Sequence, residues 1–493
     1  MLQPGTSDQT SPRATAAGGL LGAYDPDGFF CELASQRAGN PQVTQIWQRL
    51  DAMDRASLRR RARLADQELF NLGITFTVYS DRDAIDRVLP FDVIPRILTA
   101  RDWDQIRRGV EQRVTAINLF LRDIYNTGHI FRDGVVPEEL VKRNPQYRRE
   151  MEDFVPPKGV YAHIAGIDIV RNEAGGFMVL EDNARTPSGV SYVIENRHLM
   201  MRAFPDLAEG IAIADVDDYG RQLAKTLQAV APANVTGPTA VVLTPGTFNS
   251  AYFEHIFLAR EMGVPLVEGR DLVVENDRVF MRTTSGLEPV HVIYRRIDDD
   301  FLDPHAFRKE STLGVPGLFA AYRKGNVTLA NAVGTGAADD KAIYAYMPRI
   351  IKYYLQQDPI LNNVDTHICR EKGGLAYTLD NLDKLVTKPV GGSGGYGVVV
   401  GPHASQKALR EVRRQVEADP ANFISQPMIK LSVVPTLTRQ GVEPRHVDLR
   451  PFAVTGDSTW VLPGGLSRVA LKRGSLVVNS SQGGGSKDTW VLA

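Results

Sequence analysis

Cysteine is scarce in this chain of 493 residues, which contains only Cys31 and Cys369. Two cysteines so far apart argue against a disulfide framework or a zinc cluster and fit a reducing compartment, so we expect a cytoplasmic protein. An excess of one charge is also missing, because 57 Lys and Arg residues stand against 58 Asp and Glu residues. The net charge of −1 gives no indication of a nucleic acid or a membrane surface as partner.

The sequence also lacks targeting signals and the commonest nucleotide loops. No apolar run approaches the about 20 residues that span a bilayer. Residues 1–19 are rich in Gly, Ser, Thr, Ala and Pro, without the basic start and apolar centre of a signal peptide, and predict a disordered tail. No Gly-x-Gly-x-x-Gly follows the strand predicted at 239–244, so a dinucleotide site is not expected there.

Residues 20–155 predict a mainly helical N-terminal region. Apolar residues recur at helical spacing within 43–72 and again within 106–121. The β-branched and aromatic residues of 73–79 predict a strand, and the two prolines of 90–95 indicate an irregular connector.

A second unit at 238–330 reads as strand, helix and strand. The strand at 239–244 is followed by a helix at 250–262 and a strand at 265–268, and 272–281 reads as a hairpin with an Asn-Asp turn. This order predicts a parallel sheet of Rossmann-like character, which we expect to bind the substrate.

The strongest chemical signal lies in a predicted hairpin. Two apolar runs, at 164–170 and 177–180, are separated by a turn that contains Asn and Gly. Glu181 and Asn183 leave the second strand on one face, and the hairpin would bring Asp168 beside Glu181. Carboxylate and amide oxygens suit Mg²⁺, with nucleotide phosphates completing its shell. The alternative is a surface hairpin that ends in solvated charges.

A glycine-rich segment follows Lys388. Residues 385–388 and 398–400 predict two strands, and 389–397 between them contain five glycines. Glycines let backbone N–H groups approach phosphate oxygens, and the lysine adds a point charge. The lysine precedes the glycines, so this is not a Walker A loop, and a mobile surface loop is the alternative. Upstream, Asp-Asp-Lys341 opens a predicted helix and supplies a second lysine.

Together these features resemble the ATP-grasp fold. Lys341, Lys388 and the glycine-rich loop are similar to the groups that hold ATP phosphates in that family, and 425–429 resembles its adenine hinge. Most ATP-grasp proteins carry the lysines before the metal hairpin, whereas here the hairpin comes first. This order resembles the circularly permuted ATP-grasp proteins related to glutathionylspermidine synthases. The phrases at 179–192 and 479–490 resemble the uncharacterised type 2 subgroup of bacterial proteins.

The resemblance implies an α/β fold with a circularly permuted ATP-grasp core and assigns roles within it. The core would consist of the metal-binding part at 156–237 and a part at 331–493 with the lysines, the glycine-rich loop and the hinge. The implied site residues are Asp168, Glu181 and Asn183 for Mg²⁺; Lys341, Lys388, Gly391, Gly392, Ser393, Gly394, Gly395, Gln426, Pro427, Met428 and Ile429 for ATP; and Arg185 and Arg450 for the developing charge.

Other residues are candidates with open alternatives. Arg295, Arg296 and Asp298 follow a predicted strand and could bind a carboxylate or the transferring phosphate, or form a structural salt bridge. Glutathionylspermidine synthases usually carry an arginine two positions before the hairpin aspartate, where this chain has Gly166. The substrate site therefore carries over less well than the nucleotide site.

Two histidines and the C-terminal segment are weaker candidates. A single strand predicted at 445–454 puts His446 and Arg450 on one face, beside the phosphates or on an ordinary sheet surface. His163 reads more as a strand residue than as a base. Residues 482–487 could form a second phosphate or substrate loop or a flexible terminus, although Trp490 argues for docking.

The resemblance implies an ATP- and Mg²⁺-dependent ligase. A small-molecule or peptide carboxylate would attack the γ-phosphate, giving ADP and an acyl phosphate, and an amine or thiol would displace the phosphate. The alternatives are an ATP-binding sensor or scaffold without catalysis, and a phosphotransferase on the same fold. The sequence names neither substrate and does not fix the oligomeric state.

Overall fold

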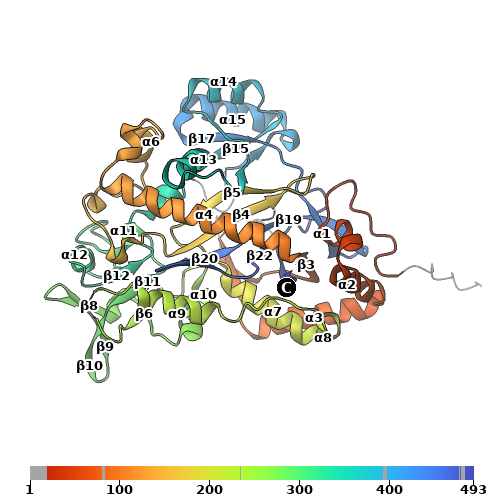
Figure 1. Cartoon of the computed structure of the whole chain (residues 1–493), viewed down its shortest axis with the longest axis horizontal. Helices are drawn as coiled ribbons and strands as arrows, with labels where there is room; N and C mark the ends of the chain where they lie inside the picture. The colour runs from red at the N-terminus through yellow and green to blue at the C-terminus, as the bar shows by residue number, and fades with distance from the viewer. Residues whose placement is uncertain (1–18, 80–83, 234, 392–396, 477, 479–483) are drawn as a thin grey trace, which may run out of the picture.

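The computed structural model describes residues 19–493 apart from 80–83, 234, 392–396, 477 and 479–483. Its centre is a ten-stranded mixed sheet, and the long helix α4 lies across it (Figure 1). The main path of this sheet is β13 (Asn362–Asn363), β5 (Phe177–Asn183), β4 (Ile164–Arg171), β19 (Val442–Arg450), β22 (Leu466–Val469), β23 (Gly485–Val491) and β3 (Phe91–Leu98), and the strands that join it are β18 (Val433–Leu437), β20 (Phe452–Thr455) and β21 (Thr459–Val461).

The hairpin predicted from the two apolar runs is confirmed as β4 and β5. The two strands are antiparallel, and Asp168 lies opposite Glu181. The Asn172 side chain closes the turn by accepting hydrogen bonds from the amides of Ala174 and Gly176, at 3.1 and 2.9 Å. Both strands lie in the middle of the sheet, so the hairpin is held by neighbours on either side.

The connector predicted at 90–95 is wrong, because these residues belong to β3. All eight residues of β3 are buried, and the strand runs parallel to β23 at the edge of the sheet. Pro95 is tolerated because an edge strand leaves one row of amides without ladder partners, and the pairing shifts register next to it. The N-terminal region thus contributes a strand to the main sheet.

The single strand predicted at 445–454 is also wrong. It is broken at Pro451 into β19 and β20, and both of these strands pair with β4. The register places Leu449 opposite Ile169 and Phe452 opposite Gly166. The break leaves Arg450 as the last residue of β19, directly beside the metal hairpin.

The unit at 238–330 contains a four-stranded parallel sheet in the order β12, β11, β6, β7, as the strand–helix–strand pattern predicted. Gly263 ends helix α10 in the left-handed conformation, with φ of +66°. The predicted hairpin is confirmed as β8 and β9, joined through an Asn-Asp turn with positive φ. The strands are β6 (Ala240–Leu243), β7 (Leu266–Val267), β8 (Leu272–Glu275), β9 (Arg278–Thr283), β10 (Gly286–Val290), β11 (Val292–Arg295) and β12 (Thr328–Ala330).

Residues 367–427 form a separate antiparallel sheet in the order β14, β17, β15, β16, with helices α14 and α15 (top of Figure 1). Strand β15 carries Lys388 as predicted, and β17 contains the first part of the predicted hinge. The bounds are β14 (His367–Ile368), α14 (Lys372–Asp380), β15 (Leu385–Pro389), β16 (Val399–Val400), α15 (Gln406–Ala418) and β17 (Phe423–Pro427).

Helices cover the remaining surfaces. Helix α4 packs on α13, and α7 packs on strand β23 of the main sheet. The other helices are α1 (Glu32–Ser35), α2 (Pro41–Asp51), α3 (Arg55–Asn71), α4 (Ala100–Tyr125), α5 (His129–Arg132), α6 (Glu138–Lys142), α7 (Val190–Ala203), α8 (Pro205–Ala208), α9 (Tyr219–Ala229), α10 (Tyr252–Met262), α11 (Asp299–Leu302), α12 (Leu318–Arg323) and α13 (Lys341–Leu355), and β1 (Thr75–Tyr79) pairs with β2 (Ala84–Val88). In the part of the chain that the structure describes, no helix combines the length and apolar character that a membrane crossing requires.

Candidate functional site

A cavity of about 1430 Å³ opens where the main sheet, the start of α13 and the parallel sheet come together. It is larger than the roughly 300–1,000 Å³ of ordinary small-molecule sites, so it has room for more than one reactant. Its walls carry both charges. The charged residues that line it are Arg143, Glu181, Asp182, Arg185, Glu254, Arg296, Asp298, Asp339, Asp340, Lys341, Arg370, Asp419, Arg450 and Arg468.

Glu181 and Asn183 face this cavity, but Asp168 does not. Asp168 is buried and accepts hydrogen bonds from Arg450, at 2.5 and 2.8 Å, and from Arg468, at 2.7 Å. Burial alone would raise the pKa of Asp168, yet these two guanidinium groups outweigh burial and hold the pKa below its ordinary value. Both oxygens of Asp168 are therefore committed to arginines.

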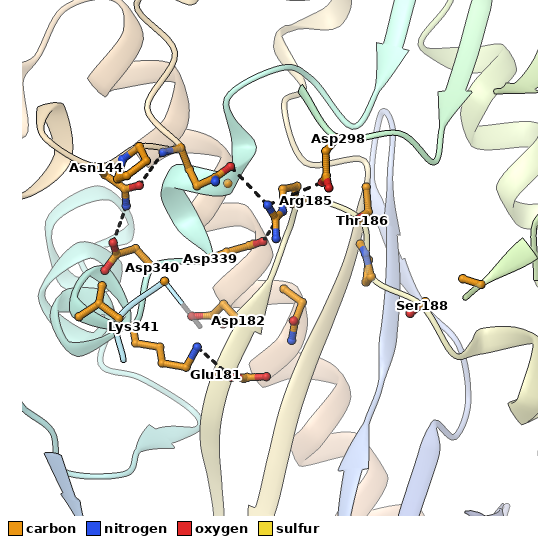
Figure 2. A pocket seen from close by; sticks show the side chains of 18 of the residues that line it. Asn144, Glu181, Asp182, Arg185, Thr186, Ser188, Asp298, Asp339, Asp340 and Lys341 are labelled. Carbon is orange, nitrogen blue, oxygen red and sulfur yellow. Dashed lines mark hydrogen bonds and ion pairs between the residues drawn. The ribbon is translucent and has the colours of Figure 1, made fainter. Parts of the chain in front are cut away.

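Lys341 is held at the start of α13 by the residue before it. The Asp340 carboxylate caps this helix by accepting from the amides of Ala342 and Ile343, at 2.7 and 3.3 Å. The Lys341 Nζ then lies 3.7 Å from the Glu181 Oε2, as the dashed line in Figure 2 shows. One of the two lysines and Glu181, the proposed metal ligand, thus meet in the cavity.

Lys388 approaches from the antiparallel unit. Its Nζ donates a 2.6 Å hydrogen bond to the Gln426 side chain. The pKa of Lys388 is lowered to about 8, mainly by burial. The negative charges of Glu181 and Asp168 oppose this shift, and the positive charge of Lys341 adds to it. Lys388 is therefore close enough to the hairpin and to the other lysine for their charges to act on it.

The hinge lies next to Lys388 but does not line the cavity. The Gln426 side chain donates to the Thr366 hydroxyl at 2.9 Å, and Pro427 ends β17. Met428 and Ile429 are partly buried, and Ile429 packs on a small apolar cluster. Of the glycine-rich loop, Gly391 lines the cavity. Gly392, Ser393, Gly394 and Gly395 lie outside the residues that the structure describes.

Arg185 lies in the middle of the cavity between two carboxylates (Figure 2). Its Nη1 is 3.7 Å from the Asp298 Oδ1 and its Nε is 3.6 Å from the Asp339 Oδ2. The Gln146 side chain accepts from the same Nη1 at 3.4 Å. These contacts are long, so they leave Arg185 free to turn toward a new negative charge.

Asp339 is a site residue that the sequence interpretation missed. It lines the cavity and accepts a 2.5 Å hydrogen bond from the amide of Ala184, directly after the metal hairpin. Burial raises the pKa of Asp339 to about 7, although Arg185 and this amide lower it. The only local signal was its position before the cap residue Asp340, and nothing local indicated its approach to the hairpin.

The structure does not bring Arg295 to the cavity. Its guanidinium is fully buried, donates to the carbonyls of Asn331, Ile297 and Ala332 at 2.7–2.9 Å, and pairs with Asp299. These bonds fix the backbone after β11 and β12 and leave no donor facing a ligand. The next residue, Arg296, lines the cavity instead.

Arg450 faces the cavity from the end of β19 and reaches the hairpin through a gap left by Gly166. A Cβ at Gly166 would lie 3.1 Å from the Arg450 Cδ. Besides Asp168, Arg450 approaches the Glu181 Oε1 to 3.9 Å and donates to the Ser188 carbonyl at 3.3 Å. The glycine in place of the arginine of glutathionylspermidine synthases thus makes room for an arginine from another strand.

Arg468 was also missed. It lies on β22, lines the cavity, and bridges Asp168 and Asp448, with its Nε 2.9 Å from the Asp448 Oδ1. Burial raises the pKa of Asp448, while Arg468 opposes this rise. The bond between Arg468 and Asp168 joins residues that lie 300 positions apart in the sequence, and no local pattern signals such a contact.

The weaker candidates lie away from the cavity. His446 is buried, and its Nδ1 is 3.0 Å from the Leu431 carbonyl. His163 is buried with neither ring nitrogen hydrogen-bonded within the described part of the chain, and burial lowers its pKa to about 3. Lys487 is buried in β23 and donates to Asp92. Trp490 is buried as the docking argument expected, and residues 482 and 483 lie outside the described residues.

Of the three residues predicted to bind Mg²⁺, Glu181 and Asn183 have side-chain oxygens that fit a metal site in the cavity. The cations nearest the Glu181 oxygens stand 3.7 and 3.9 Å away, and Asn183 lines the same cavity, where its Oδ1 is the atom that could bind Mg²⁺. Asp168 could join them only if Arg450 released it. Across the described residues no three His, Cys, Asp or Glu side chains gather at a metal site, so a bound ion would depend on phosphate oxygens as well.

Comparison with known proteins identifies the family. The sequence profile described as circularly permuted ATP-grasp type 2 matches residues 95–470. The chain therefore belongs to this family. ATP-grasp proteins generally bind ATP and Mg²⁺, and membership supports an ATP-dependent ligase in general.

Relatives with high identity occur in several bacteria. An uncharacterised protein of Synechocystis sp. is 50% identical over 474 residues, which cover 96% of this chain and 98% of that protein. An uncharacterised protein of Mycobacterium tuberculosis is 51% identical over 449 residues, covering 91% and 81%. A protein of Frankia casuarinae, provisionally named glutamate–cysteine ligase 2-2, is 42% identical over 487 residues. These cover 98% of this chain but 55% of the Frankia protein, so the chain spans about half of its length.

A solved structure shares the fold at low identity. The glutathione synthetase-like effector of Globodera pallida, in its apo form, superposes with a TM-score of 0.58 at 10% identity. The match covers 89% of this chain and 98% of the effector. It supports the mixed α/β fold and carries no statement about activity.

Proposed function

We propose that the protein is an ATP- and Mg²⁺-dependent ligase that joins a carboxylate to an amine or a thiol through an acyl phosphate, with release of ADP. The observation that carries this proposal is the meeting of Lys341, Glu181, Arg185 and Arg450 around one cavity, with Lys388 close by on the facing unit. The cavity has room for a second reactant beside the nucleotide. The name of the Frankia relative also points to a carboxylate–amine ligase.

Each group has a part in the proposed reaction. Lys341 and Lys388 bind the phosphates as point charges. A carboxylate oxygen of the first substrate attacks the γ-phosphorus, the bond to the β-phosphate oxygen breaks, and ADP leaves. Arg185 and Arg450 stabilise the negative charge that develops on the transferring group.

Glu181 and Asn183 would hold Mg²⁺, with Asp168 as a further ligand once Arg450 turns to the phosphates. When bound, the ion would supply positive charge to neutralise the phosphates. The amine or thiol then attacks the acyl carbon and phosphate leaves. We assign adenine to the hinge at 426–429, substrate binding to the parallel-sheet unit at 238–330, and the whole reaction to the cytoplasm.

A hydroxylamine screen tests this proposal. Enzyme, Mg-ATP and hydroxylamine are incubated with sets of amino acids, short peptides and thiol peptides, and ADP and hydroxamate are measured. A ligase gives both products together, because hydroxylamine intercepts the acyl phosphate. Lys388→Ala abolishes them, whereas Lys384→Ala, an exposed lysine on the same unit, does not.

Other products would contradict the mechanism. AMP and pyrophosphate would exclude attack on the γ-phosphate. ADP with a phosphorylated alcohol and no hydroxamate would make the protein a phosphotransferase. Nucleotide binding without turnover across the whole screen would favour the sensor or scaffold.

A further inference from the structure

One corner of the cavity is separate from the lysines and the metal hairpin. It lies at the carboxyl ends of β6 and β11, where ligands commonly bind to parallel α/β sheets. The first turn of helix α10 begins there, and Asn249, Ser250 and Ala251 before it line the cavity. Of the candidates named from the sequence, Arg296 lines this corner, whereas His255 was not among them.

His255 supplies an unpartnered donor in this corner. Only 1% of its surface is exposed, yet it lines the cavity. Its Nδ1 is 2.8 Å from the Thr244 Oγ1, which itself accepts from the Gly246 amide at 3.1 Å. The Thr244 hydroxyl hydrogen is thus available to Nδ1, and we assign the imidazole hydrogen to Nε2. No partner for Nε2 is recorded among the described residues.

The imidazole is neutral. Burial lowers the pKa of His255 far below its ordinary value, and the nearby positive charge of Arg296 lowers it further. A neutral imidazole with hydrogen on Nε2 presents a donor, and not an additional acceptor, to the cavity.

Arg296 adds a second donor. It is 5% exposed and lines the same corner, and its Nε has no hydrogen-bond partner among the described residues. Its other nitrogens are used: Nη1 donates to the Pro187 carbonyl at 2.8 Å and Nη2 to the Glu254 Oε1 at 3.0 Å. The guanidinium thus brings a buried positive charge to this corner, where it pairs with the Glu254 carboxylate.

The Glu254 carboxylate, which lines this corner, is already neutralised. Glu254 pairs with Arg296 through one oxygen, and its other oxygen accepts from the amides of Gly189 and Ser191, at 2.7 and 3.2 Å. Ser191 also donates its hydroxyl at 3.0 Å. With Glu254 committed, the described groups of this corner that favour an anion are the His255 Nε2, the positive charge of Arg296 and the N-terminal end of α10.

We propose that this corner is an anion subsite that binds a second, non-reacting carboxylate of a substrate, through the His255 Nε2, Arg296 and the first turn of α10. A helix N-terminus with buried donors favours an anion. This inference rests on the proposed ligase and names its substrate class: an acid that carries a carboxylate besides the reacting centre, such as a dicarboxylate, an acidic amino acid or a peptide with a free C-terminus.

Binding is tested without turnover. Protein labelled in its histidine rings is titrated with glutarate, and His255 is assigned among the nine histidines by its loss in His255→Leu. We expect the His255 ring nitrogens of the free protein to report hydrogen on Nε2, and we expect their signals to shift on titration at about millimolar glutarate. Glutaramide, the uncharged diamide, should leave them unchanged. An unmoved His255 signal at tens of millimolar glutarate, or an equal shift with glutaramide, would overturn the subsite.

Turnover provides a second arm. For a substrate with two carboxylates, His255→Leu should raise KM about ten- to a hundredfold with little change in kcat. The reason is that binding to the remote carboxylate is lost equally in the ground state and in the transition state. All activity should be unchanged in the control variant His305→Leu, which alters an exposed histidine on the same unit. An unchanged KM in His255→Leu would overturn the subsite.

The two proposals fail separately. Glutarate binding at His255 in a protein that gives no ADP with any acid would support the subsite and refute the ligase. Hydroxamate formation with equal efficiency from mono- and dicarboxylates would support the ligase and refute the subsite.

Discussion

Lys388 gives the nucleotide site a pH dependence that can be measured. In the free protein burial lowers the pKa of Lys388 to about 8, from 10.5 for an ordinary lysine. The unfolded chain then binds more protons than the folded one between these values, so the stability of the free protein should rise with pH across that window. Phosphates favour the charged ammonium, so nucleotide binding should take up a proton and weaken as pH rises above about 8.

The size of the effect follows from this pKa. The charged fraction of Lys388 in the free protein falls from about three quarters at pH 7.5 to about 3% at pH 9.5. If the bound phosphates keep the lysine charged, affinity should fall about 25-fold over this range, or about 1.9 kcal/mol. Phosphate groups titrate near pH 6 and contribute little there.

Calorimetric titration with Mg-ADP avoids turnover and measures both quantities. Repeating it in buffers of different ionisation enthalpy counts the protons taken up, which should be about half a proton per site at pH 8. Lys388→Arg keeps its charge throughout and should lose the pH dependence, whereas Lys384→Arg should keep it. A flat affinity in the wild-type protein, or the same slope in Lys388→Arg, would refute the reasoning.

Three further changes have expected outcomes. Arg113→Met leaves the buried Asp182 carboxylate without its bidentate partner and should cost about 3–5 kcal/mol in urea unfolding, more than Arg113→Met with Asp182→Leu. Asp340→Ala removes the cap of α13 and should cost about 0.5–2 kcal/mol of unfolding free energy and weaken nucleotide binding through the adjacent lysine. Gly166→Ala should displace the Arg450 side chain, lowering kcat with little loss of thermal stability; unchanged kcat would contradict a role for Arg450.

Features with local signals were predictable from the sequence. Two apolar runs and a turn that contains Asn and Gly predicted the β4–β5 hairpin, and the position of the turn predicted its register. The start of α13 was equally local, because an acidic cap residue directly precedes Lys341. Two elements of the site were therefore predictable before any tertiary contact was known.

Strand β3 had no such signal. It is fully buried, yet it contains Asp92 and Arg96, which a buried strand excludes unless each finds a partner. Their partners are Lys487 and Glu32, which lie far away in the sequence. When only the local sequence is considered, charged residues such as Asp92 and Arg96 indicate an exposed segment, because the distant partners that allow their burial are not visible.

The choice between neighbouring residues was also beyond local reasoning. Arg295 is the last residue of β11 and Arg296 follows it, so alternation sends the two side chains to opposite faces without indicating which face meets the cavity. The contacts decide: Arg295 binds three carbonyls inside the fold, whereas Arg296 binds Glu254 and lines the cavity. Arg468 and Asp339 were missed because their partners lie on other strands and loops.

The permuted order of the chain is compatible with this site because the site depends on strand pairing and not on sequence order. The pairing of β19 with β4 carries Arg450 to the Asp168 carboxylate, wherever either strand begins in the chain. The segment after the hairpin is then fixed from both sides, since the Ser188 carbonyl accepts from Arg450 and the Pro187 carbonyl from Arg296. Arg185 projects into the cavity from the same segment, so the proposed phosphate site and the proposed carboxylate subsite are held at a fixed spacing by one short stretch of backbone. A substrate that engages both would be positioned by the fold itself, without a lid having to close on it.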